Sequence, residues 1–174
     1  IVRDYLPYSP SLYQKGYSGK VVQVRPSPHA PTATMKTFNF LNHIIAKMEA
    51  KASGFNEGIL VNTDGHVTEG TVSNIFTVTG NCLTTPAQGA GLLPGVTRQV
   101  ILELAEEKQI KSEEGTVTPQ QLAGADEAFL TNSLVEIMPL VELDGQPIGT
   151  GIPGPVTQEL IVSYKKRVQE ELQL

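Results

Sequence analysis

Two residues of this sequence have side chains suited to covalent and electrostatic chemistry, Lys36 and Glu69. Apolar and uncharged residues follow Lys36 at 37–41, and an amine partly withdrawn from water loses its proton more readily, as a nucleophile requires. Glu69 precedes a segment expected to be a buried strand, where its carboxylate could pair with a protonated ring nitrogen. Taken alone, a lysine is usually a solvated surface charge and Glu69 could equally be a turn carboxylate, so other groups must decide.

Two further segments could bind an anion. Residues 92–98, Leu-Leu-Pro-Gly-Val-Thr-Arg, form a glycine-containing loop before a predicted helix, and N–H groups at a helix start can bind phosphate. Pro94 stands where a dinucleotide fingerprint needs its third glycine, and a Gly-Lys-Ser/Thr ending is missing, so a nucleotide loop is not supported. Asn132 and Ser133 form a polar turn that could bind a phosphate or carboxylate, or only satisfy itself.

Apolar spacing predicts the helices that position these groups. An amphipathic helix is expected to run to about Ala52 with Lys36 at its entrance, and a second helix is expected at 97–109. Thr118 and Pro119 are typical of a helix start, and a closing helix follows the Gly- and Pro-rich tract that ends at Pro155. The apolar positions of the first helix, which we expect to share one face, are Phe38, Leu41, Ile44, Ile45 and Met48.

Strand signals occur in the centre of the sequence and again toward its end. The Asp64-Gly65 turn between two apolar runs predicts a hairpin, and the following runs extend it into an antiparallel meander. Five prolines between residues 7 and 31 argue against a helix there and predict an extended connector. The predicted strands are 58–62, 67 onward, 73–78, 82–85, 127–131 and 136–140.

The composition is that of one folded domain: 174 residues, 40% hydrophobic, 18% charged, with a net charge of -5. No strongly basic surface is expected, so we predict no nucleic-acid partner. One cysteine, Cys82, and no apolar run near ~20 residues predict a cytoplasmic protein without a membrane span. Three histidines lack metal-ligand spacing, so we expect no metal and interpret them as surface or turn residues: His29, His43 and His66.

Taken together, these segments resemble the pyridoxal-phosphate enzymes of the class IV aminotransferase family (fold type IV). The resemblance covers about residues 25–164 and rests on four motifs in order: Lys-x-x-Asn from Lys36, Glu-Gly-x-x-x-Asn-Ile-Phe from Glu69, Leu-Pro-Gly-Val-Thr-Arg from Leu93, and Asn-Ser before Glu-Ile-x-Pro from Asn132. It implies an α/β (α+β) fold like that of D-amino-acid aminotransferase, with an antiparallel-rich sheet or barrel flanked by helices.

The resemblance also implies a role for each site residue, with pyridoxal 5'-phosphate as the cofactor. Lys36 would form the Schiff base and act as general base, and Glu69 would pair with the pyridine nitrogen. The remaining cofactor-binding residues would be Leu93 against the ring, Val96, Thr97 and Ser133 at the phosphate, and Arg25 in support of Glu69. The substrate-binding residues would be Phe40, Asn132 and Leu134.

By the same resemblance, the chain divides into three parts. Residues 1–6 would be the last strand of a mostly missing N-terminal domain, 7–31 an interdomain connector, and 32–174 the large, cofactor-binding C-terminal domain. Members of the family are homodimers, so a second copy is the expected partner, besides a small-molecule substrate.

The activity within the family is left open by the sequence. Asn39, three residues after Lys36, and Asn132-Ser133-Leu134 favour the lyase or D-amino-acid branch, whereas Glu136-Ile137 is shared with transaminases. We favour 4-amino-4-deoxychorismate lyase, which forms p-aminobenzoate and pyruvate for folate synthesis. The alternatives are a branched-chain or D-amino-acid aminotransferase, and a catalytically inactive fragment that only dimerises.

Overall fold

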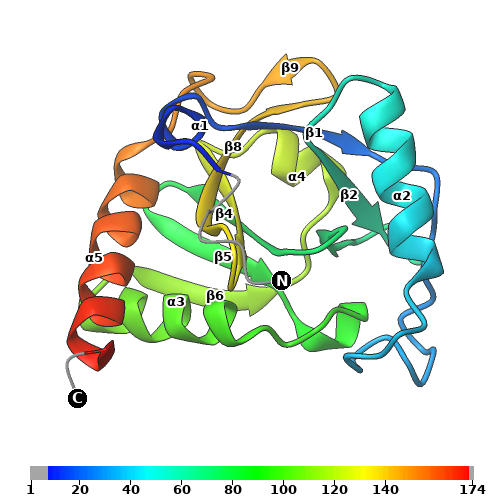
Figure 1. Cartoon of the computed structure of the whole chain (residues 1–174), viewed down its shortest axis with the longest axis horizontal. Helices are drawn as coiled ribbons and strands as arrows, with labels where there is room; N and C mark the ends of the chain where they lie inside the picture. Colours follow the sequence, from blue (N-terminus) through cyan, green and yellow to red (C-terminus); the bar gives the residue numbers. More distant parts are fainter. Residues whose placement is uncertain (1–7, 173–174) are drawn as a thin grey trace, which may run out of the picture.

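A curled sheet with helices on its outside dominates the computed structural model, which describes residues 8–172 (Figure 1). The strands run in the order β3-β2-β1-β8-β7-β4-β5-β6, with β9 paired to β8, and most pairs are antiparallel. This architecture confirms the predicted α/β (α+β) class with flanking helices. The strands are β1 (Tyr17–Val21), β2 (Glu57–Val61), β3 (Val67–Gly70), β4 (Asn74–Thr79), β5 (Cys82–Pro86), β6 (Lys111–Gly115), β7 (Glu127–Asn132), β8 (Glu136–Leu143) and β9 (Gln146–Pro147).

Most predicted helices are present in the structure. The Thr118 hydroxyl caps its helix by accepting the N–H of Gln121, and the Gln121 side chain accepts the Thr118 N–H in return. This reciprocal pair explains why a helix only five residues long begins where the sequence indicates. The helices are α1 (Pro10–Lys15), α2 (Leu41–Ala52), α3 (Val96–Glu107), α4 (Pro119–Ala123) and α5 (Pro155–Leu172), with a 3-10 turn at Gln88–Ala90.

Residues 8–31 contain a helix, although the prolines of this segment were predicted to prevent one. Helix α1 begins at Pro10, at a position whose N–H would have no helical partner, so proline is tolerated there. Strand β1 is paired in parallel with both β2 and β8, inside the sheet. The division of the chain at residue 31 stays a prediction, and the strand predicted at 1–6 lies outside the described residues.

The predicted antiparallel meander is wrong, although its strands exist. The β2–β3 hairpin lies at one end of the sheet, while β4 and β5 lie near the other, with β1, β8 and β7 between them. After β3 the Gly70 N–H donates to the Ser73 carbonyl, and β4 then pairs with β7, where Asn74 lies opposite Thr131. Alternation predicts that a segment is a strand, but the partner is decided by tertiary packing.

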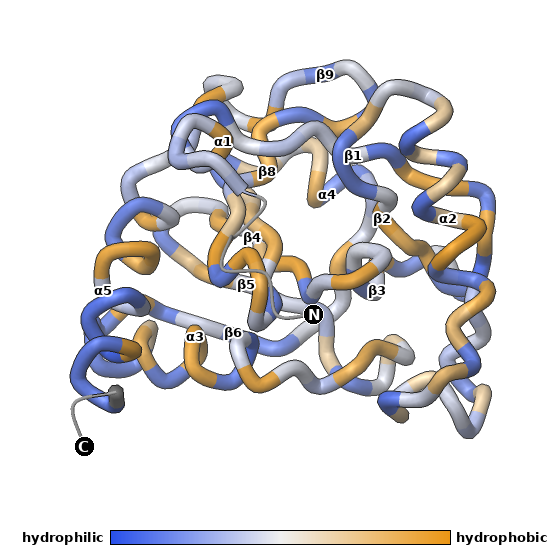
Figure 2. Tube along the Cα trace, viewed as in Figure 1, coloured by the Kyte–Doolittle hydropathy of each residue, from blue (hydrophilic) through white to orange (hydrophobic). Residues whose placement is uncertain are grey.

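Helix α2 packs with a face that its apolar spacing does not indicate. It begins only at Leu41, and its buried residues are Ala46 and Ala50, which pack near Val22 and Leu60. Small side chains let the helix backbone approach the sheet closely. Figure 2 shows apolar colour on this outer helix, and the residues predicted to face inward are exposed: Phe38, Leu41, Ile44, Ile45 and Met48.

Two main apolar clusters hold the sheet and the outer helices together. One gathers residues such as Ile59, Leu130 and Met138, and the other packs α3 and α5 against the sheet around Phe76 and Phe129. The rings of Phe76 and Phe129 stack with centroids 5.0 Å apart. Within residues 8–172, no helix combines the length and the apolar character that a bilayer crossing needs.

Candidate functional site

The carboxylate of Glu69 is held from two sides at the end of β3. Its Oε2 accepts the N–H of Leu93 at 3.2 Å, and its Oε1 lies 3.3 Å from Nε2 of His43 on α2. The Glu69 side chain is 10% exposed. The prediction that His43 is a surface or turn residue is therefore wrong, because its ring reaches the candidate ring-binding carboxylate. No motif around His43 indicated this contact.

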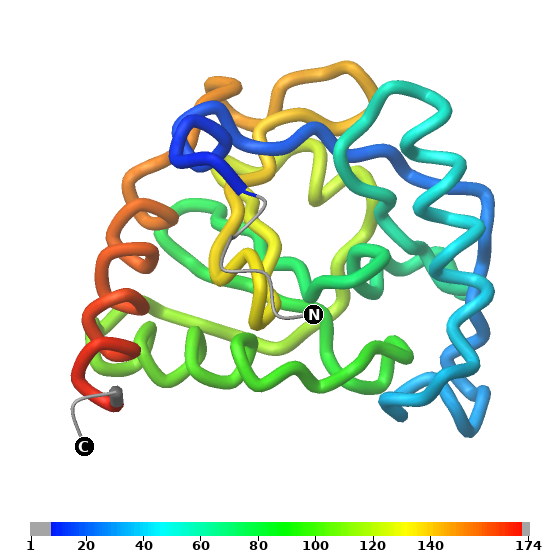
Figure 3. Tube along the Cα trace, viewed as in Figure 1, coloured from blue at the N-terminus to red at the C-terminus, as the bar shows by residue number. Residues whose placement is uncertain are grey.

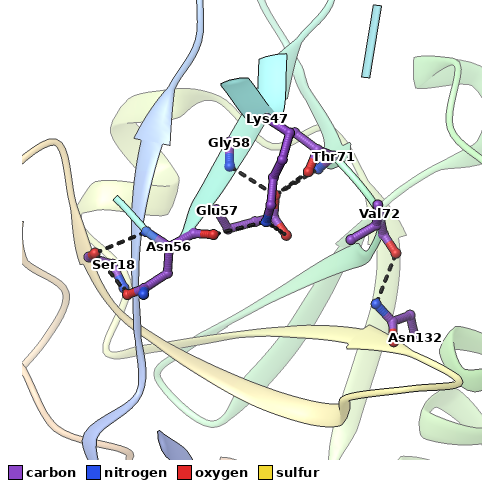
Figure 4. Close-up of polar contacts among 8 residues, drawn as sticks. All are labelled: Ser18, Lys47, Asn56, Glu57, Gly58, Thr71, Val72 and Asn132. Carbon is purple, nitrogen blue, oxygen red and sulfur yellow. Dashed lines mark hydrogen bonds and ion pairs between the residues drawn. The ribbon is translucent and has the colours of Figure 1, made fainter. Parts of the chain in front are cut away.

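A second glutamate, Glu57, anchors the turn that follows Glu69 (Figure 4). It accepts the N–H of Gly58 at 2.9 Å and hydrogen bonds from the backbone and hydroxyl of Thr71, and Lys47 Nζ lies 3.0 Å from Oε2. Glu57 is buried, so these donors offset the cost of removing its charge from water. The network joins β2, α2 and Thr71, and it thereby fixes the end of β3, where Glu69 lies.

The start of α3 is a helix terminus without a side-chain cap. Its N-cap residue is Gly95, and no side chain accepts from the first-turn N–H groups of Val96, Thr97 and Arg98 in the described chain. Asn74 lies against Gly95, where an added Cβ would come within 2.2 Å of Asn74 Oδ1. The Asn74 amide donates instead to the carbonyl of Leu93 at 2.7 Å, which ties the loop to β4.

The polar turn after β7 is largely satisfied by its own atoms. Asn132 Oδ1 accepts the N–H groups of Leu134 and Val135, each at 2.8 Å. Its Nδ2 donates to the carbonyl of Val72 at 2.9 Å and joins this turn to the one after Glu69 (Figure 4). Ser133 and Leu134 are exposed at the tip. The geometry therefore gives Asn132 a structural role beside its predicted substrate role.

Lys36 lies in a loop of turns, five residues before α2, and not at the helix entrance as predicted. Its side chain is exposed, and no hydrogen bond or ion pair joins it to Glu69 among the described residues. In this loop, Pro28 packs on Gly91 close to the start of α3. Figure 3 shows the loop, in light blue, at the N-terminal end of α2.

Two other predicted residues are placed by this loop and by α2. The ring of Phe40 stacks on His43 with centroids 4.4 Å apart and an angle of 4°, so Phe40 is linked to Glu69 through that histidine. Arg25 Nη1 donates to the carbonyls of Val22 and Val24, and no ion pair joins it to Glu69 within the described residues. Among the described residues, the side chain that contacts Glu69 from α2 is His43, and the role implied for Arg25 stays a prediction.

A small cavity of about 30 Å³ with a mixed polar and apolar lining lies between the Glu57 network and the Asn132 turn. Its lining includes Tyr17 and Ser73. The Oγ of Ser73 is buried without a hydrogen-bond partner among the described residues. Burial, followed by the neighbouring Tyr8 and Glu57, raises the pKa of Tyr17 to about 12, so this phenol stays neutral at ordinary pH. The cavity has room for about one water molecule, too little for a substrate.

A larger hollow, of about 730 Å³, lies between α3 and β6, away from these residues. It is open to solvent and lined by several glutamates, so its charge would repel a phosphate or a carboxylate. We therefore place the candidate site at Glu69, Leu93 and the start of α3, although the hollow is larger. The glutamates are Glu103, Glu106, Glu113 and Glu114.

Comparison with known proteins assigns this geometry to a family. The family model described as amino-transferase class IV matches residues 1–143. The chain is 35% identical over 151 residues to the aminodeoxychorismate lyase of Bacillus subtilis, covering 87% of this chain and 51% of that protein. It is 36% identical over 137 residues to the D-alanine aminotransferase of Bacillus licheniformis, covering 79% of this chain and 48% of that protein.

Solved structures agree with these relatives. The branched-chain aminotransferase of Escherichia coli superposes with a TM-score of 0.85 and 32% identity, over 91% of this chain and 54% of that chain. That of Thermoproteus uzoniensis, solved with norvaline, gives a TM-score of 0.83 and 34% identity over 92% of this chain and 54% of that chain. The chain spans about half the length of the curated relatives it matches.

Proposed function

The chain belongs to the class IV aminotransferase family, whose members use pyridoxal phosphate, and we propose that the whole protein is a pyridoxal-phosphate enzyme with Lys36 as its covalent attachment point. One observation carries the proposal. The hydrogen bond from Leu93 N–H to Glu69 joins a buried carboxylate to the loop that opens an uncapped helix. An acceptor for a ring nitrogen and a set of phosphate donors are thereby held by one loop.

The residues present fit this cofactor. The first-turn N–H groups of α3 have no side-chain acceptor, and a helix start favours a phosphate dianion. The Glu69 carboxylate has about four lone-pair sites, of which Leu93 and His43 use two, so it can also accept a pyridine N–H. Thr97 is buried in the first turn of α3, where its hydroxyl can add a donor.

In the proposed mechanism the bound cofactor supplies an electron sink for the pair that the substrate carbon loses with its proton. Lys36 Nζ would take that proton as general base. Glu69 would keep a proton on the ring nitrogen, and Val96 and Thr97 would hold the phosphate with their N–H groups. Lys36 is exposed in this chain, so the proposal requires that further groups, such as the cofactor or a second copy, cover it and withdraw its amine from water.

Within the family we favour 4-amino-4-deoxychorismate lyase. Asn39 and the Asn132-Ser133-Leu134 turn support this branch by resemblance, and the lyase of Bacillus subtilis is similar over 87% of this chain. A branched-chain aminotransferase is the second candidate, because the solved structures of such enzymes superpose with TM-scores of 0.82 to 0.85. In a transaminase Lys36 would return the proton to the cofactor, whereas in the lyase pyruvate leaves.

Two incubations separate these activities. The whole protein is first given 4-amino-4-deoxychorismate, and release of p-aminobenzoate is followed by fluorescence, with Lys36→Ala as the control. It is then given branched-chain L-amino acids or D-alanine without a keto acid. The lyase proposal predicts p-aminobenzoate in the first experiment and no build-up of pyridoxamine phosphate in the second. Stoichiometric pyridoxamine phosphate without p-aminobenzoate would instead identify a transaminase.

A homodimer in the cytoplasm completes the proposal. Seven of the twelve exposed large hydrophobic side chains lie between residues 35 and 48, so the described chain leaves apolar surface for a contact there. The catalytically inactive, dimer-forming alternative predicts association without cofactor. Analytical ultracentrifugation with and without pyridoxal phosphate tests this: a dimer that develops no visible cofactor absorption would support the inactive alternative, and a monomer would contradict the dimer.

A further inference from the structure

His43 is one of only two groups that hold the Glu69 carboxylate among the described residues. Its Nε2 lies 3.3 Å from Oε1, while the Leu93 N–H holds Oε2 at 3.2 Å. An ionised carboxylate only accepts hydrogen bonds, so Nε2 must carry the proton in this contact. The two oxygens are thus held by one donor each, from α2 on one side and from the loop before α3 on the other.

The imidazole of His43 is itself fixed by its surroundings. Phe40 stacks on it with ring centroids 4.4 Å apart and an angle of 4°. The side chain is 23% exposed, and its Nδ1 is buried without a hydrogen-bond partner. With Nδ1 unpartnered, Glu69 is the one polar contact that the described residues offer this ring, so its orientation is set by the stack and by the carboxylate together.

The position of His43 on α2 explains how it reaches Glu69. It lies three and seven residues before Ala46 and Ala50, which are fully buried, so these three residues share one face of the helix. His43 is therefore the polar member of the packed face of α2. Arg25, which the family resemblance placed beside Glu69, donates to the carbonyls of Val22 and Val24 instead.

We propose that His43 is the positioning residue of Glu69: its Nε2–H holds Oε1 so that a free lone pair of the carboxylate faces the ring nitrogen of the cofactor. The role rests on the proposed function, because it requires a pyridine nitrogen to be bound. A donor that restrains a carboxylate lowers the entropic cost of a further hydrogen bond to it, because fewer orientations remain to be lost.

The test compares cofactor affinity in four forms of the whole protein. His43→Phe keeps a ring for the Phe40 stack but cannot donate, and His43→Gln restores a donor. His66→Phe is the matched control, since it exchanges a histidine in the turn before β3 whose side chain makes no hydrogen bond in the described structure. The probes are pyridoxal phosphate and its 1-deaza analogue, in which C–H replaces the ring nitrogen. Thermal unfolding without cofactor shows whether each variant folds.

We expect His43→Phe to weaken pyridoxal phosphate binding about ten-fold, as a hydrogen bond to a charged group implies. His43→Gln should recover most of that loss, and His66→Phe should bind like the wild type. The deaza analogue should bind the wild type and His43→Phe with affinities within about two-fold of each other, because it makes no hydrogen bond to Glu69.

Equal weakening for both probes, or unchanged binding of pyridoxal phosphate by a folded His43→Phe, would overturn the assignment of His43. If the wild type binds neither probe, the proposed function fails as well, so the two failures are distinguishable.

Discussion

Two helices of this molecule begin with similar sequences, but in the described structure only one of them has a carboxylate that accepts hydrogen bonds from its first-turn N–H groups. Helix α5 follows Gly154, and the buried Glu127 carboxylate accepts the N–H groups of Val156 at 3.0 Å and Thr157 at 2.8 Å. Helix α3 follows Gly95, no side chain caps it in the described chain, and the side chain that lies against Gly95 is the neutral amide of Asn74. Within the described residues, the protein thus supplies its own anion to the start of α5 and none to the start of α3.

The glycines show that both arrangements depend on close approach. A Cβ at Gly154 would lie 2.1 Å from Cδ of Glu127, and one at Gly95 would lie 2.2 Å from Oδ1 of Asn74. Each glycine lets a side chain of the sheet reach the helix start. Among residues 8–172 no carboxylate accepts from the start of α3 as Glu127 does at α5, and the proposed phosphate site rests on that difference.

The comparison requires that both helices are anchored equally well, and core truncations test this with the largest expected effect. Ile101 on α3 and Leu160 on α5 are fully buried in one cluster. Ile101→Ala and Leu160→Ala should each lower the free energy of unfolding by about 3 kcal/mol in urea denaturation. Val162→Ala, at a side chain 69% exposed, is the control. If only one core variant is destabilised, the helices are not equivalent.

Removal of the internal anion has the next largest effect. Glu127→Ala deletes both acceptors of the α5 start, so the free energy of unfolding should fall by about 2 kcal/mol. Glu106→Ala removes an exposed carboxylate from α3 and should change stability by less than about 0.5 kcal/mol. Equal effects of the two variants would mean that Glu127 does not cap α5.

An anion added at the start of α3 should have a smaller effect on stability than the two changes above. It should raise the stability of the fold and lower the affinity for the cofactor. Val96 is 77% exposed at the first helical position. Val96→Asp should stabilise the fold by roughly 0.3–1 kcal/mol through the helix dipole. The same charge should weaken pyridoxal phosphate binding about ten-fold by repelling the phosphate. Calorimetry and absorption titration measure the two effects.

The control for this charge is the neutral variant Val96→Asn, together with pyridoxal, which lacks the phosphate. We expect Val96→Asn to bind pyridoxal phosphate like the wild type, and Val96→Asp to bind pyridoxal normally. Weaker binding of both probes by Val96→Asp would place the phosphate elsewhere.

Local sequence predicted much of this site because its main parts are local. The loop from Leu93 into α3 and the end of β3 at Glu69 lie where the motifs indicate. The start of α4 was predictable for the same reason, since Thr118 and Gln121 cap it within one turn. Proline was misinterpreted at Pro10, where the first turn of a helix tolerates it.

Tertiary contacts could not be predicted in the same way. The spacing of apolar residues in α2 identified a stripe, but the helix packs through Ala46 and Ala50, and the stripe faces outward. His43 was missed because one histidine among apolar residues has no local signal, and its partner Glu69 is 26 residues away. The strand pairing expected for the meander was wrong for the same reason, because the true partners are distant in sequence.

The central claim is that one lysine, one carboxylate and one open helix start hold the same cofactor. Its most direct test is reduction of the whole protein with borohydride in the presence of pyridoxal phosphate, followed by peptide mass spectrometry. We predict one stoichiometric phosphopyridoxyl group, attached to Lys36, with less labelling in Val96→Asp at limiting cofactor. Labelling of another lysine, or no stoichiometric labelling of the wild type, would contradict the account.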